Sequence, residues 1–283
     1  MKNNNNNMII YKKLDENTNT LVFSDNFSGP FDDNIIWNIY KFKKIYFGRY
    51  LNCSIDLLKK LELLYGKKKL SKYPKILLTN PEYIFLTHIY FGDFFNKPVD
   101  EILPDTILLL KFGYHFSQRV ENLPPHLQSL TFGCKFNQPV YSLPLGLKEL
   151  VFNEHFNQPV NCLPEYLETL TFGMLFNQPV NCLPPNLKYL NFGFSFNQPI
   201  DNLPLGIKTL VLSNKFDHPV DMIPSSIELL ELPKKYSHSL ENLPSSIKEV
   251  KCGSDIFARK NFGSLQGILQ NSHIKLSLGN KML

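Results

Sequence analysis

The chain has 283 residues, of which 43% are hydrophobic, and these are the proportions of a folded protein with a substantial core. No apolar run reaches the ~18 residues of a transmembrane helix, so we expect no contact with a membrane. The formal net charge of +5 comes from lysines concentrated between Lys59 and Lys75, and the remaining residues are close to neutral. A charge confined to one patch argues against a nucleic-acid-binding surface.

Residues 1–20 begin MKNNNNNMII, and this Asn-rich stretch is typical of a disordered N-terminus. It contains no apolar segment long enough for a signal peptide, which predicts an intracellular, cytoplasmic protein. The five cysteines form no CxxC pair and are expected to be thiols. Cys162 and Cys182 occupy the same place in two consecutive repeats, where parallel side chains are poorly arranged for a disulfide.

Residues 21–94 contain weak copies of a strand followed by a turn. LVF at 21–23 and IYF at 45–47 and 89–91 favour strands, and FSGPFD (27–32), LNCSID (51–56) and FNKPVD (95–100) favour turns. A helix is predicted at about 54–66, between an N-cap at Ser54 and a stop at Gly66. It is interpreted as a capping helix or, alternatively, as a partner-binding helix. The lysine-rich segment around it is interpreted as a solvated loop, with nuclear import or binding to an anionic surface as alternatives.

Residues 95–253 repeat a unit such as LPEYLETLTFGMLFNQPVNC (163–182), and Leu-Pro or Ile-Pro recurs every twenty residues from position 103. Two prolines in each unit exclude a long helix, and Leu170-Thr171-Phe172 alternates as a strand does. One unit is too small to fold alone, so the repeats must stack. We expect the aromatic residue of FNQP to form a buried structural ladder: Phe116, Phe136, Phe156, Phe176, Phe196 and Phe216.

Two further positions of the unit predict turns. The short polar residue after the aromatic is expected to bond to backbone groups two residues on, and it includes Asn137, Asn157, Asn177 and Asn197. Glycine follows the strand at 113, 133, 173 and 193, with Asn153 and Ser213 at the same place, which predicts a turn with positive φ.

The FNQP and LPxxLxxLxF motifs resemble the FNIP repeats, a relative of the leucine-rich repeats. The resemblance implies a mainly β, right-handed solenoid with a parallel concave sheet and an extended, irregular convex side, together with the one N-terminal helix. FNIP repeats are found in social amoebae and giant amoeba viruses, so a viral source would place the protein in host cytoplasm. Residues 254–283 are expected to form a C-terminal cap, with a last strand at 273–279.

No motif in the chain indicates catalysis. Phosphate-binding loops and zinc-type Cys/His spacings are absent from the sequence, so we expect no enzyme, no cofactor and no metal. His218 and His238 occupy equivalent positions and are interpreted as solvated turn residues.

The function favoured by these features is that of a monomeric protein–protein interaction scaffold. Alternation in the strands predicts which residues face outward on the concave sheet, and a cluster of Met, Tyr and Phe among them favours a partner site. The candidate partner-binding residues are Thr169, Thr171, Met174, Tyr189, Asn191, Phe194 and Val211. The alternative is the substrate-recognition subunit of a ubiquitin ligase, because some members of the resembled family carry an F-box, although none is evident here.

Overall fold

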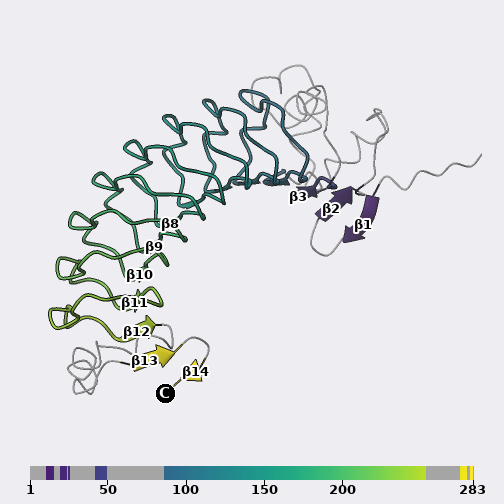
Figure 1. Ribbon diagram of the computed structural model, residues 1–283. Coiled ribbons are helices and arrows are strands. Elements are labelled where there is room, and N and C mark those ends of the chain that lie inside the picture. The colour runs from purple at the N-terminus through teal and green to yellow at the C-terminus, as the bar shows by residue number, and fades with distance from the viewer. Residues whose placement is uncertain are drawn as a thin grey trace, which may run out of the picture. The chain divides into compact units, whose positions relative to one another are not determined.

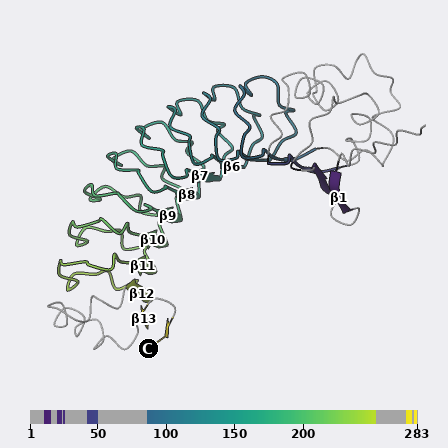
Figure 2. The same ribbon diagram turned by 45° about the vertical axis from the view of Figure 1, so that its right-hand side comes forward.

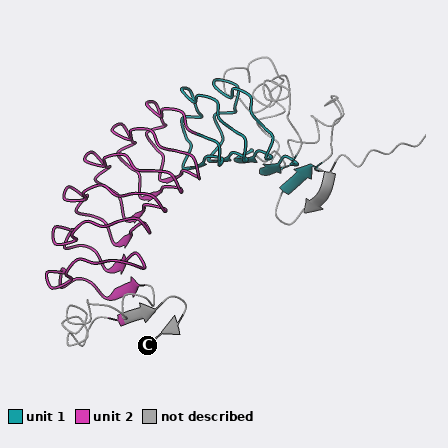
Figure 3. Ribbon diagram, in the orientation of Figure 1, with its two compact units in different colours: residues 1–136 teal, residues 137–283 magenta. Residues whose placement is uncertain are grey.

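The computed structural model describes residues 11–15, 20–23, 25, 42–49, 86–252, 275–278 and 281–282 (Figure 1). The chain divides into two units, residues 1–136 and residues 137–283 (Figure 3). This division falls inside the segment 95–253 that the repeats predict. No helix occurs within the described ranges, and the helix predicted at about 54–66 lies outside them.

The first unit is a stack of coils, each contributing one short strand to a sheet. Strand β1 (Tyr11–Asp15) pairs antiparallel with β2 (Thr20–Phe23). The strands that follow β2 pair in parallel and in sequence order: β3 (Lys44–Tyr46), β4 (His88–Tyr90), β5 (Leu109–Lys111) and β6 (Ser129–Thr131).

The second unit has the same construction, and its strands follow one another along the inner side of its curve (Figures 2 and 3). Its parallel strands are β7 (Glu149–Val151), β8 (Thr169–Thr171), β9 (Tyr189–Asn191), β10 (Thr209–Val211), β11 (Leu229–Glu231), β12 (Glu249–Cys252) and β13 (Lys275–Leu278). Strand β14 (Lys281–Met282) pairs antiparallel with β13. The predicted mainly β, leucine-rich-repeat-like solenoid is confirmed.

Burial within each coil follows the apolar positions of the repeat. In the unit 163–182, Leu167, Leu170, Phe172, Phe176 and Val180 are all buried. The prolines close turns instead of continuing a helix, and the amide of Leu167 donates to the carbonyl oxygen of Pro164 at 3.2 Å. The strand is therefore only three residues long, and the rest of the coil is extended or turned.

Two columns of phenylalanine rings fill the interior of the second unit. Phe156, Phe176, Phe196 and Phe216, from the FNQP-type motifs, stack with ring centroids 6.0–6.4 Å apart. A second column runs through Phe152, Phe172 and Phe192, which stand directly after the strands, at 5.8 and 6.1 Å. Within one coil, the rings of Phe172 and Phe176 stack at 3.6 Å. The first unit repeats this arrangement with Phe112, Phe116, Phe132 and Phe136.

The polar residue of FNQP links neighbouring coils, so the predicted bond within its own turn is wrong. The Oδ1 atom of Asn157 accepts from the backbone N–H of Asn177 at 2.9 Å and from Nε2 of Gln178 at 3.2 Å. The Oδ1 atom of Asn177 accepts in the same way from Asn197 and Gln198. The physical reason is the in-register stacking, which places the backbone amide of the next coil within hydrogen-bond distance of the side chain. In the same way, the Oδ1 atom of Asn137 accepts from the backbone N–H of Asn157, and the Oδ1 atom of Asn197 accepts from that of Asp217.

The glycines after the strands stand where the backbones of neighbouring coils approach closely, and most of them do not have an unusual backbone conformation. Only Gly193, with φ of 68°, has the predicted positive φ, so the prediction is wrong for Gly113, Gly133 and Gly173. A Cβ atom on Gly173 would lie 2.0 Å from the carbonyl oxygen of Asn153 in the preceding coil. Ser213 occupies the same position, is buried, and donates its hydroxyl to the carbonyl oxygen of Phe196.

We predict that Gly173→Ala lowers the free energy of unfolding by about 1–3 kcal/mol, because the added methyl group forces two backbones apart. Urea denaturation followed by circular dichroism measures this change. The control is Gly146→Ala, where an added Cβ meets nothing within 4 Å, and we expect a change within about 0.5 kcal/mol there. Equal stabilities of the two variants would contradict the steric explanation.

We predict that Asn177→Ala destabilises the protein by about 1 kcal/mol for each of the two hydrogen bonds that its oxygen accepts. Asn177→Asp keeps an acceptor oxygen, and Asp217 already occupies the equivalent position, where it accepts from the hydroxyl of Ser237 at 2.9 Å. The Asp variant should therefore retain most of the stability in the same urea experiment. A loss as large as that of the Ala variant would show that the accepted bonds are not the cause.

Candidate functional site on the strand face of the second unit

The seven predicted partner-binding residues all lie on or directly after three consecutive strands. Thr169 and Thr171 flank Leu170 on β8, Tyr189 and Asn191 flank Leu190 on β9, and Val211 follows Leu210 on β10. The three leucines are fully buried, and the residues beside them are half-exposed. Met174 and Phe194, in the turns after β8 and β9, are 47% and 42% exposed. The strand face therefore carries these side chains outward.

Parallel, in-register pairing arranges the face into rows. Tyr189 lies between Thr169 and Thr209 in one row, and Asn191 lies between Thr171 and Val211 in the other. Neighbouring strands in a sheet are roughly 4.8 Å apart, so residues of one row are in direct reach of each other. Tyr189 is half-buried and stands between two threonines.

Asn191 organises the turn that presents Phe194. Its Oδ1 atom accepts from the backbone N–H of Gly193 at 2.9 Å, and its Nδ2 lies 3.4 Å from the hydroxyl of Tyr189. This local bond accompanies the positive φ of Gly193. The amide of Ser195 then donates to the carbonyl oxygen of Met174 at 3.0 Å, which joins this turn to the equivalent turn of the coil before it. The backbone around Phe194 is thus held by one hydrogen bond within its own turn and by another to the preceding coil.

A row of charged residues stands directly before the strands of the second unit and was not among the predicted site residues. It consists of Lys148, Glu168, Lys188, Lys208, Glu228 and Lys248. The twenty-residue spacing of these lysines and glutamates could have identified the row, but a single unit considered alone assigns the position to a loop. The row marks the edge of the sheet at which the strands begin.

Within this row Glu168 pairs with Lys188, and Glu228 pairs with both Lys208 and Lys248. Glu228 lies between Lys248, with Nζ 2.6 Å from Oε2, and Lys208, with Nζ 3.0 Å from Oε1. The hydrogen bond from Lys248, then the one from Lys208, and then the charges of both lysines lower the pKa of Glu228 to about 2. The pKa of Glu168 is lowered mainly by its bond to Lys188. The row is therefore a network of ion pairs rather than a set of reactive groups.

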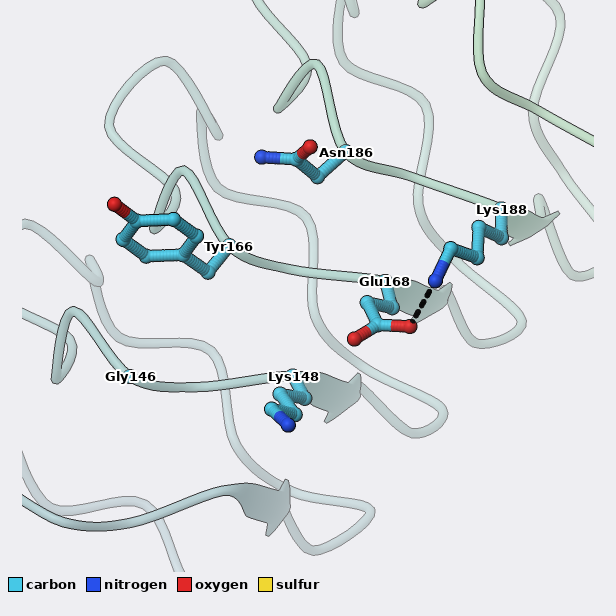
Figure 4. A pocket seen from close by; sticks show the side chains of 6 residues that line it. All are labelled: Gly146, Lys148, Tyr166, Glu168, Asn186 and Lys188. Atoms are coloured by element: carbon cyan, nitrogen blue, oxygen red, sulfur yellow. Dashed lines mark hydrogen bonds and ion pairs between the residues drawn. The ribbon is translucent and has the colours of Figure 1, made fainter.

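A shallow groove of about 260 Å³ opens at the start of β8 and β9 (Figure 4). It is lined by residues of three successive coils: Gly146, Lys148, Tyr166, Glu168, Asn186 and Lys188. Figure 4 shows the ion pair of Glu168 and Lys188 at the strand end of the groove, with Tyr166 and Asn186 nearer the preceding turns.

His218 and His238 take the place that glutamine holds in the other FNQP motifs. The Nε2 atom of His218 lies 3.3 Å from the carbonyl oxygen of Asn197, and that of His238 lies 3.0 Å from the carbonyl oxygen of Asp217. They therefore belong to the links between coils. Within the part of the chain that can be described, no three metal-ligating side chains come together, and no helix is long and apolar enough to span a membrane.

The match to a protein-family model agrees with the repeat pattern. The FNIP Repeat family model matches residues 95–135, 136–174, 159–195, 176–215 and 196–235. Among solved structures, the chain is similar to the crystal structure of CroV588, described as a novel circular LRR protein structure, with 27% identity and a TM-score of 0.41. That match covers 84% of this chain and 50% of the CroV588 chain, so this chain spans half of its length. No curated protein matches the sequence.

We predict that the carboxyl group of Glu228 stays ionised down to about pH 2 in the folded protein. Because this pKa is below the ordinary value of 4.5, the ion pairs stabilise the fold above pH 4.5 and lose that contribution as the pH falls toward 2. Carboxyl-carbon NMR titration measures the pKa. Either Lys248→Met or Lys208→Met should raise it toward 4.5, and an ordinary titration in the unsubstituted protein would contradict the pairing.

Proposed function

Residues 95–235 of this chain are FNIP repeats, and from this premise we propose that the protein is a non-enzymatic scaffold that binds another protein through the strand face of its second unit. The contact residues are the seven on β8, β9, β10 and the turns that follow them. Binding needs no cofactor in this proposal, because the face recognises its partner by shape and by apolar contact.

The observation that carries the proposal is the exposure of Met174 and Phe194 beside Tyr189 on a backbone that neighbouring coils hold in place. Large aromatic side chains and methionine are enriched in protein interfaces, and few residues supply most of the binding energy. The backbone beneath them is already ordered, so binding costs little conformational entropy. None of the seven residues is charged, which suits a neutral, apolar partner segment.

The experiment compares two double variants with equal numbers of truncated apolar side chains. Tyr189→Ala with Phe194→Ala removes the two aromatic rings of the strand face. Tyr141→Ala with Leu145→Ala removes two side chains that are 70% and 76% exposed but lie away from the strands. Tagged proteins are used to capture partners from lysate of the source cells, and mass spectrometry quantifies them.

We expect the strand-face variant to lose its partner by about 30-fold or more, which corresponds to a loss of about 2 kcal/mol, whereas the control variant keeps it. Circular dichroism must show that both variants are folded. Equal recovery by all three proteins, or loss only in the control variant, would refute the proposed face. Recovery of a ubiquitin-ligase adaptor that both variants retain would instead support the substrate-receptor role.

A further inference from the structure

Two exposed thiols occupy the same place in consecutive coils of the second unit. Cys162 and Cys182 each follow an FNQPVN segment and precede a Leu-Pro turn, and both are free and exposed. Neither belongs to the strand face or to the buried columns. The distance at which the coils hold them decides whether they can act as a pair.

Contacts between the same two coils bracket the cysteines on both sides. Before them, the rings of Phe156 and Phe176 stack at 6.2 Å, and the amide of Asn177 donates to Oδ1 of Asn157. After them, the amide of Lys188 donates to the carbonyl oxygen of Glu168 at 2.8 Å. The intervening segments have the same length and nearly the same sequence. Since the stacked rings of the same two coils are 6.2 Å apart, we infer that equivalent atoms of Cys162 and Cys182 lie about one such coil spacing apart when both side chains have the same rotamer.

This separation suits a bridging ion better than a disulfide. A disulfide needs Cβ atoms within about 4.5 Å of each other, and two parallel Cβ atoms at the coil spacing exceed that limit unless the backbone moves. Two sulfur atoms on one metal ion, with metal–sulfur bonds of about 2.3 Å, are roughly 4–4.6 Å apart. Rotating the two cysteine side chains toward each other shortens the sulfur–sulfur distance to this value without moving the coils.

We propose that Cys162 and Cys182 form a two-sulfur site for a soft monovalent metal ion, Cu(I). Thiolates select soft ions, and Cu(I) accepts two sulfur ligands, whereas a structural zinc site requires four ligands. Among the described residues no third ligand joins the pair. Binding converts two thiols and one Cu⁺ into a bis-thiolate complex of charge −1 and releases two protons, with no change of oxidation state.

The test uses the full chain with Cys53→Ser and Cys134→Ser, which removes two other cysteines and leaves Cys252 buried. Cu(I) is titrated anaerobically in competition with bicinchoninate, whose coloured Cu(I) complex reports the copper that the protein has not bound. We expect one Cu(I) per chain, and loss of that binding when either Cys162→Ser or Cys182→Ser is added. Size-exclusion chromatography of the loaded protein should show no new dimer.

A rescue variant tests whether binding depends on two cysteines at equivalent positions of adjacent coils or only on the number of thiols in the chain. Asn202 occupies the same position in the next coil, so Asn202→Cys combined with Cys162→Ser moves the pair one coil along and should restore binding. Binding that survives in both single Ser variants, one ion shared by two chains, or no rescue by Asn202→Cys would overturn the proposal. The strand face is not altered in any of these proteins, so the result is independent of the proposed partner binding.

Discussion

The structure depends on one constraint, which is that each coil lies in register on the coil before it. The stacked phenylalanine rings report that register, because their planes stay nearly parallel and their centroids stay about one coil apart. The register even survives one extra residue. Phe95 and Phe116 are 21 positions apart instead of twenty, yet their rings stack at 6.0 Å, and Glu101 in the longer connection has a φ of 60°.

The asparagine ladder, the close backbone approaches at the glycines and the charged row all follow from that register. A residue that stands above its own equivalent can form a continuous row, so the asparagines become a ladder of bonds between coils and the glycines become points of close backbone approach. The same geometry produces the charged row before the strands, in which Glu228 faces the ammonium groups of both adjacent coils. The buried core, the hydrogen bonds between coils and the charged row on the surface therefore all result from the in-register stacking of one repeated coil.

The core positions and the strand-face positions differ in how much they vary along this chain. The buried places hold leucine and phenylalanine in coil after coil, whereas the outward places on β8, β9 and β10 hold Thr, Tyr, Asn and Val. A constant core sets the spacing of the rows, and the variable places decide which side chains meet a partner. This separation is what makes a repeat surface suitable for recognition, and it also allows exposed cysteines at the same position of two consecutive coils.

Much was determined by the sequence alone: the period of twenty, the strand at Leu170, the burial of the FNQP phenylalanine and the outward residues of the strands. These are local properties, because alternation and proline restrict the backbone of a single unit. Only the tertiary structure decided that Asn177 bonds to the next coil, that Gly173 avoids a clash instead of adopting positive φ, and that Glu228 sits between two lysines. Those facts depend on distances between residues twenty positions apart, which stacking sets and which no single repeat contains.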